Sequence, residues 1–158
     1  MDADHFRGQF LSRIADLERG MDAVIFAFYE VDPEKELLFR STILARMGLR
    51  AKTEAVDHVV AALDLDDAPP FSSLPRRLRK ATQTRNLVAH ARSANSELDR
   101  QLLRYSWAKR GKALVQDVQP EHELQRLVEL DDAVAQLLGE ALRVSRHRDA
   151  VLGAGDSR

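Results

Sequence analysis

The chain has 158 residues, the length of about one domain and enough to enclose a single hydrophobic core. With 44% hydrophobic and 31% charged residues, its composition is typical of a soluble globular protein and not of a disordered one. The absence of cysteine excludes disulfides and thiolate metal sites and fits a reducing compartment. The first ten residues lack the apolar core of a signal peptide, and no apolar run approaches the roughly 18 residues of a membrane span, so we expect a cytoplasmic protein with no membrane segment.

The net charge of −1 conceals an uneven distribution of charge along the chain. Residues 68–116 hold 11 Lys and Arg against two acids, Glu97 and Asp99, so the remainder of the chain is strongly acidic. Such an asymmetry is typical of proteins that bind an anionic ligand, and nucleic acid is the commonest one. The alternative is that the basic region pairs with the acidic remainder of the same fold.

The first part of the chain predicts helices. Apolar residues recur at spacings of three and four over residues 4–29, the period of an amphipathic helix. Asp32 and Pro33 suit the cap and the first turn of a second helix, which we expect over 33–47 with an apolar stripe of Leu37, Leu38, Ile43, Leu44 and Met47. A third helical stretch covers 49–65, and whether 33–65 is one helix or two stays open.

Acidic side chains are frequent on the first helix. Their interpretation is a solvated, salt-bridged surface, because arginines alternate with the carboxylates at helical spacing. The residues concerned are Asp16, Glu18, Asp22 and Glu30, with Arg13 and Arg19 between them.

The paired prolines at 69 and 70 place a loop over 66–73, and Ser73 is positioned to cap the helix that follows. We expect that helix over 74–92. The segments around 98–107 and 112–118, separated by a turn at 109–111, predict a β-hairpin, with continued helix over 97–108 as the alternative.

Pro120 then opens a last, strongly amphipathic helix that we expect to end near His147. The expected fold is therefore all-α: an up-down bundle of four to five helices with a short β-hairpin before the last helix. One helical domain would cover 1–147, and the remaining residues, 148–158, would form a disordered tail.

Several well-known catalytic and binding patterns are missing from the sequence. It has no glycine-rich phosphate loop, no nucleophile elbow and no cysteine nucleophile. His5, His58, His122 and His147 have no partner in a recognised metal-ligand spacing, so we expect neither a metal nor a cofactor.

One group of residues on the basic helix has the types that cleavage of RNA without a metal requires. Asn86 and His90 are four residues apart and so project from one face of the helix, and the long side chain of Arg85 can reach the same site. Histidine can take the proton of a ribose 2′-OH or return one to the leaving 5′-oxygen, and arginine can stabilise charge on the phosphate. Since one histidine does not easily do both, a two-fold dimer would supply the second.

The segment Arg85-Asn86-Leu87-Val88-Ala89-His90 resembles the signature of the HEPN family (higher eukaryotes and prokaryotes nucleotide-binding), which is Arg-x(4–6)-His, often with Asn after the Arg. The order of helices around it is also similar, over about residues 5–147. The resemblance implies a metal-independent endoribonuclease that acts as a homodimer, with the motif at the subunit interface. It also implies a toxin or phage-defence role, with a nucleotidyltransferase-type antitoxin as a possible partner.

On this hypothesis Arg85, Asn86 and His90 form the catalytic group. The RNA-binding residues would be the surrounding cations, Arg76, Arg77, Arg79, Lys80 and Arg92, through release of counterions from phosphate. An assisting acid cannot be placed by spacing, and Glu54 and Asp57 would be guesses. The alternatives are a non-catalytic helical module that binds RNA or a partner protein, and a dimeric scaffold whose basic helix pairs with its own acidic remainder.

Overall fold

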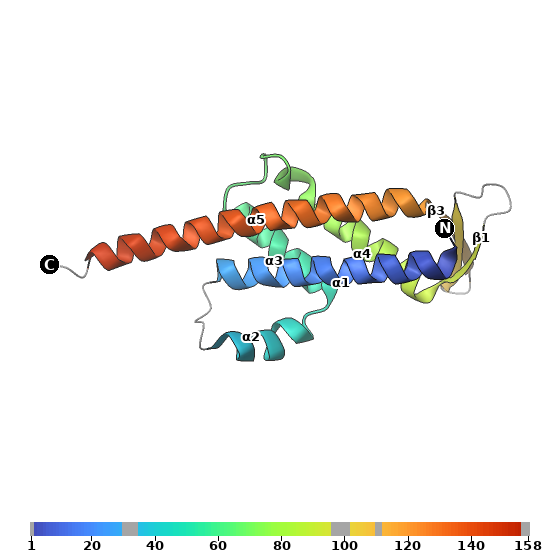
Figure 1. Ribbon diagram of the computed structural model, residues 1–158, viewed down its shortest axis with the longest axis horizontal. Helices are drawn as coiled ribbons and strands as arrows, with labels where there is room; N and C mark the ends of the chain where they lie inside the picture. The colour runs from blue at the N-terminus through green and yellow to red at the C-terminus, as the bar shows by residue number, and fades with distance from the viewer. Residues whose placement is uncertain (1, 30–34, 96–101, 110–111, 156–158) are drawn as a thin grey trace.

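The computed structural model describes residues 2–29, 35–95, 102–109 and 112–155. Its helices and strands are α1 (Ala3–Phe28), α2 (Glu36–Thr42), α3 (Leu49–Ala62), α4 (Leu74–His90), β1 (Arg92–Asn95), β2 (Leu103–Lys109), β3 (Lys112–Val118) and α5 (Pro120–Gly155). Short 3-10 turns, η2 (Leu44–Arg46) and η3 (Phe71–Ser73), precede α3 and α4. The prediction of an all-α helical bundle with a hairpin before the last helix is confirmed (Figure 1).

Helices α1 and α5 run side by side in the same direction along the length of the molecule (Figure 1). The contact is close at Gly20, where an added Cβ would lie 3.1 Å from the Cγ1 of Val134. The apolar stripe expected on the first helix is buried here: Phe6, Phe10, Ile14, Leu17, Met21, Val24 and Ile25 all lie in the core. The 3.6-residue period of the sequence therefore predicts both the helix and the face that it buries.

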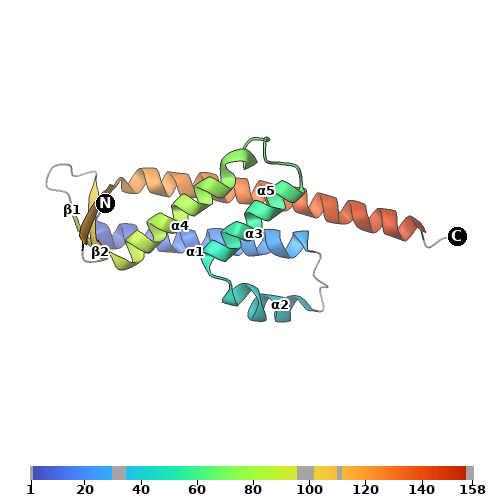
Figure 2. The ribbon, with the colours of Figure 1, turned by 180° about the vertical axis from the view of Figure 1, so that it is seen from behind.

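Helices α3 and α4 form a second layer on α1 (Figure 2). Val56, Val59 and Val60 of α3 and Leu74, Leu78 and Val88 of α4 join the same hydrophobic core. Helix α4 runs back towards the β-sheet, opposite in direction to α5, and contacts α1, α3 and α5 (Figure 2).

The second predicted helix is wrong in its extent and in its burial. Residues 36–62 hold two helices, because the chain leaves the helical conformation after η2 and Gly48 is extended at ψ 159°; Asp32 and Pro33, the predicted cap and first turn, lie outside the described residues. In the expected apolar stripe only Leu44 is buried, whereas Leu37 and Leu38 are 80% and 65% exposed. Helix α2 instead contacts α1 through Phe39, whose ring centroid lies 6.2 Å from that of Phe26.

The loop before α4 is where the prolines place it, and the Pro69–Pro70 bond is cis. Ser73 occupies the cap position, but its side chain makes no capping hydrogen bond. The reason is local: at φ −105° and ψ −6° Ser73 continues from the 3-10 turn into the helix without the extended geometry that a capping serine needs. The prediction of a side-chain cap is therefore wrong, although the helix begins at the next residue.

The predicted hairpin is confirmed, and a third strand joins it. Strand β2 pairs antiparallel with β3, with Lys109 opposite Lys112, and β1 pairs antiparallel with β2, with Ser93 opposite Tyr105. Strand β1 begins two residues after α4 ends, so α4 stops at His90 and not at 92. The alternative of helix over 97–108 is wrong for 103–108; residues 97–101 lie outside the described part of the chain.

Helix α5 extends to Gly155, eight residues beyond the predicted end at His147. The helix continues past the predicted end because no proline and no glycine lies between His147 and Gly153. Residues 156–158 lie outside the described part of the chain. Within the described residues, no helix has the length and hydrophobicity needed to cross a bilayer.

Candidate functional site

Helix α4 divides its side chains between a buried and an exposed face. The buried face packs Leu74, Leu78, Ala81 and Val88 into the core, with Thr84 beside them. The opposite face carries exposed polar side chains at helical spacing, and we call it the α4 stripe: Arg76, Lys80, Gln83, Asn86 and His90. At 1.5 Å per residue the stripe is about 21 Å long. No Asp or Glu occurs anywhere in α4, so the stripe contains no acid of its own.

The three residues predicted to act together lie near the C-terminal end of α4. The half-buried Arg85 emerges from the side of the helix, and its Nη1 donates a hydrogen bond to Oδ1 of Asn86 at 3.1 Å. This contact turns the guanidinium towards the α4 stripe, as the sequence analysis expects from the length of the side chain. Asn86 and the exposed His90 follow one another at a spacing of one turn.

An arginine from α1 holds the helix end that carries His90. Arg7 donates from Nε to the carbonyl oxygen of Val88 at 3.0 Å and from Nη2 to that of Ala91 at 3.1 Å. The carbonyl of Val88 is one of those that a helix end leaves without an intrahelical partner, and a cation is favoured at this end of the helix dipole. Arg7 therefore fixes the backbone on both sides of His90, a role that sequence spacing gave no means of finding.

A buried tyrosine lies in the neighbouring strand. Tyr105 of β2 is fully buried, and its hydroxyl has no hydrogen-bond partner among the described residues. Burial raises the pKa of Tyr105 above its usual value, and the positive charge of Arg7 partly opposes that effect. Arg7, which holds the end of α4, is thus close enough to Tyr105 to influence its pKa.

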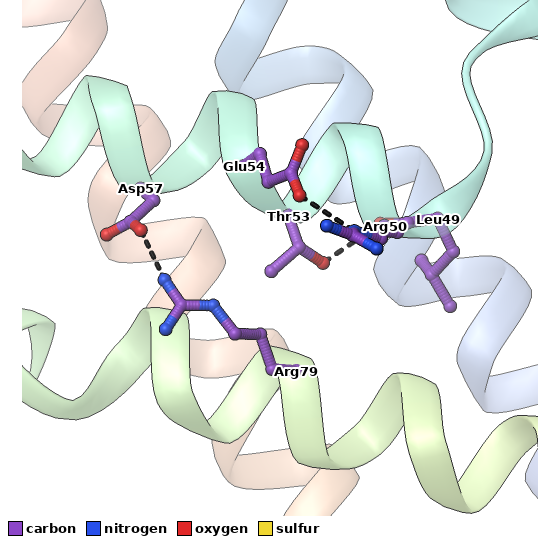
Figure 3. Close-up of polar contacts among 6 residues, drawn as sticks. All are labelled: Leu49, Arg50, Thr53, Glu54, Asp57 and Arg79. Atoms are coloured by element: carbon purple, nitrogen blue, oxygen red, sulfur yellow. Dashed lines mark hydrogen bonds and ion pairs between the residues drawn. The ribbon is translucent and has the colours of Figure 1, made fainter.

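Two of the cations predicted to bind RNA form ion pairs with acids of neighbouring helices. Arg79 forms an ion pair with Asp57 of α3, and the close-up in Figure 3 shows the two side chains meeting across the gap between the helices. Arg77 lies 3.2 Å from Glu129 of α5. Arg76 and Lys80, by contrast, are exposed and make no ion pair within the described part of the chain. Arg92 lies in β1, and the structure does not describe its side chain.

Neither acid considered as an assistant to His90 is directed at it. Asp57 is engaged by Arg79, and Glu54 accepts a hydrogen bond from Nε of Arg50 at 2.8 Å, on the part of α3 drawn in Figure 3. The bond of Glu54 lies within α3, and the bond of Asp57 joins α3 to Arg79 of α4. His90, by contrast, is the last residue of α4. Glu54 and Asp57 therefore act in ion pairs.

Asn86 and His90 of the motif are exposed on the outer surface of the single chain. Three cavities of the described structure lie along α1 and α5, at the far end of α5, and between α4 and α5, and none of these three is lined by Arg85, Asn86 or His90. The motif lies on an open surface because Asn86 and His90 face away from the core that α4 covers. Among the described residues no group of three His, Asp or Glu side chains could hold a metal ion.

A second charged cluster lies inside the bundle, where the sequence analysis expected a solvated surface. Lys52 of α3 is only 3% exposed, and its Nζ lies 2.9 Å from Glu18 and 2.8 Å from Asp22 of α1. Although burial favours the neutral amine, the hydrogen bonds that Lys52 donates to Asp22 and Glu18 raise the pKa of Lys52. The surface interpretation holds for Asp16, which pairs with Arg19, and is wrong for Asp22, whose side chain is only 18% exposed; Glu18 is half-buried, and Glu30 lies outside the described residues.

Comparison of the chain with known protein families, with characterised proteins and with solved structures finds no match.

Proposed function

We propose that the α4 stripe is the site of a metal-independent endoribonuclease of the HEPN type. The observation that carries this proposal is the contact of Arg85 with Asn86, which places a guanidinium beside an amide one helical turn before an exposed histidine. The helix that carries them has no acid to neutralise the cation or repel a phosphate. Arg7 supports the same proposal, because it holds the backbone on both sides of His90.

The chemistry follows from the residue types. The ribose 2′-oxygen attacks the adjacent phosphorus, the bond from phosphorus to the 5′-oxygen breaks, and the products carry a 2′,3′-cyclic phosphate and a 5′-hydroxyl. Neutral His90 would accept the 2′-OH proton, and a protonated histidine would donate to the leaving 5′-oxygen. Arg85 would stabilise the negative charge on the phosphate oxygens, with Asn86 orienting the guanidinium.

An open surface suits a site completed by a second molecule. On this proposal the second histidine comes from another copy of the chain, with the α4 stripes of two copies facing one another and the RNA. Arg76 and Lys80 would contribute to binding by contacting phosphate.

A second candidate is a non-catalytic module that binds RNA through the same stripe. The observation that favours it is the exposure of Asn86 and His90 on the open surface of α4, where a ligand is not enclosed. This module would show strongly salt-dependent binding without turnover.

The two candidates separate in a cleavage assay on total RNA in the presence of EDTA. Wild type and His122→Ala should cleave, because His122 is an exposed residue in the first turn of α5, whereas His90→Ala should lose activity by about 10²-fold or more. Both variants should unfold at the temperature of the wild type. Cleavage by His90→Ala at the wild-type rate would contradict the site, and RNA binding without cleavage by any of the three would favour the binding module.

A further inference from the structure

A groove lies on the surface between α1 and α5, and we call it the α1–α5 groove. Residues 8–13 of α1 and 121–128 of α5 contribute its lining, and its volume is about 600 Å³. Sites that bind small molecules typically have volumes of about 300–1,000 Å³. Its Gln9 and Ser12 lie about 140–200° around α1 from Arg7, the residue that contacts the end of α4. The α1–α5 groove is therefore separate from the α4 stripe.

Gly8 lines the groove and has no reason within the described chain to be a glycine. A glycine in the interior of a helix destabilises it relative to alanine. At Gly20 the fold explains the choice, because an added Cβ would lie 3.1 Å from the Cγ1 of Val134. At Gly8, by contrast, an added Cβ would meet no atom of the described residues within 4 Å beyond the adjacent backbone. The missing side chain leaves room for a molecule that is not part of the chain.

Two opposite charges lie at the two ends of the groove. Arg13 and Glu121 are both exposed, and neither side chain makes an ion pair or a hydrogen bond within the described part of the chain. Gly20 contacts Val134, so at 1.5 Å per residue the backbone of Glu121 lies about 9 Å along the groove from that of Arg13. A ligand that satisfies both residues carries a positive and a negative group about this far apart.

The lining between the two charges suits a peptide. Leu124 and Val128 are half-buried and give the groove an apolar surface. Gln9 and Gln125 approach it from the two helices, and their amides both donate and accept hydrogen bonds, as peptide groups do. Gln9 is positioned by His5, whose Nε2 lies 3.0 Å from the Nε2 of Gln9.

We infer that the α1–α5 groove binds a short free peptide in an extended conformation, with its amino group at Glu121 and its carboxylate at Arg13. An extended chain spans at most about 3.3–3.6 Å per residue, so about three residues reach from one charge to the other. The charged ends of such a peptide complement the two charges of the groove. Gly8 leaves space for a side chain of the peptide. The inference does not depend on the proposed function.

Calorimetric titration of the wild type with the tripeptide alanyl-leucyl-alanine tests the inference. The free peptide should bind with a Kd of about 1 mM or lower. The same peptide with an acetylated amino end and an amidated carboxyl end lacks both charges and should bind at least about tenfold more weakly. Absence of binding by the free peptide, or equal binding of the two forms, would overturn the inference.

Peptides blocked at one end test the orientation. Arg13→Gln should abolish the preference for a free carboxylate over an amide, and Glu121→Gln should abolish the preference for a free amino group over an acetylated one. Arg19→Gln, an exposed arginine of α1 outside the groove, should keep both preferences. Both preferences retained in Arg13→Gln and Glu121→Gln would contradict the assignment of the two ends.

Filling the space at Gly8 separates binding from stability. Gly8→Leu should weaken binding of the free peptide at least about tenfold and should leave the melting temperature unchanged or raise it, because leucine favours a helix more than glycine does. Ala15→Leu enlarges an exposed residue of α1 outside the groove and should bind as the wild type does. Wild-type affinity in the folded Gly8→Leu variant would overturn the inference.

Discussion

Two groups of charged residues in this chain show opposite uses of charge. Lys52, Glu18 and Asp22 lie between α1 and α3, where the lysine is 3% exposed and its positive charge is matched by two carboxylates. Arg85, Asn86 and His90 lie at the surface of α4, where no acid of the same helix accompanies the cation. The buried cluster has its charges paired inside the protein, whereas the surface group is exposed where the proposed function needs contact with RNA. The difference predicts that the first group determines stability and the second determines function.

The largest effect on stability should come from the buried cluster. Lys52→Met leaves Asp22 and Glu18 without their counter-charge, and we expect the free energy of unfolding to fall by about 3 kcal/mol. Arg19→Met removes a cation of an exposed pair and should cost less than about 1 kcal/mol. Urea unfolding of both variants measures the difference. Equal losses of unfolding free energy in the two variants would show that the buried ion pairs of Lys52 contribute no more to stability than an exposed pair.

Removal of Arg7 should lower both the stability of the fold and the rate of RNA cleavage. Arg7→Met leaves the carbonyls of Val88 and Ala91 without their donors, and we expect a loss of about 2 kcal/mol in unfolding free energy. The variant should also lower cleavage more than RNA binding, since the end of α4 that carries His90 loses its anchor. Arg13→Met, an exposed arginine on the same helix, is the control. A loss of RNA binding in proportion to cleavage would argue against an effect at His90.

The exposed and the paired cations of α4 should differ in RNA binding. Arg76→Gln should reduce the slope of log K against log salt by about 1, as expected for one lost phosphate contact. Arg79→Gln should change that slope less, because Asp57 already engages Arg79. Filter binding at several salt concentrations gives both slopes. Equal slopes for the two variants would remove the distinction between paired and exposed cations.

The smallest effect concerns Tyr105. Its buried hydroxyl lacks a partner among the described residues, so Tyr105→Phe should leave stability near neutral pH unchanged or raise it by up to about 1 kcal/mol. A phenol whose folded pKa lies above the unfolded value of 10.0 binds its proton more tightly when folded. Its deprotonation therefore favours unfolding, and the wild type should lose more stability than Tyr105→Phe as the pH rises above about 10. Parallel alkaline unfolding curves would contradict the raised pKa.

Local sequence signals predict the parts of the fold that local physics determines. The apolar period of α1, the proline at the start of α4 and the motif on its outer face are all visible in the sequence. The failures depend on distant partners: Lys52 lies 30 residues from Asp22, and Arg7 lies more than 80 residues from the carbonyls that it holds. Helix α2 shows the converse, because its apolar pattern predicts burial that the single chain does not supply. The apolar period of a sequence predicts which face of a helix is hydrophobic, but it does not identify the surface that this face contacts.

The most direct test of the central claim, that the surface group performs chemistry on RNA, compares an RNA oligonucleotide with its all-2′-deoxy counterpart in EDTA. Attack by the 2′-oxygen predicts that the wild-type protein cleaves the RNA to fragments ending in 2′,3′-cyclic phosphate and leaves the DNA intact. Mass spectrometry of the fragments identifies their ends. Cleavage of the DNA, or RNA fragments ending in a 3′-hydroxyl, would contradict the account.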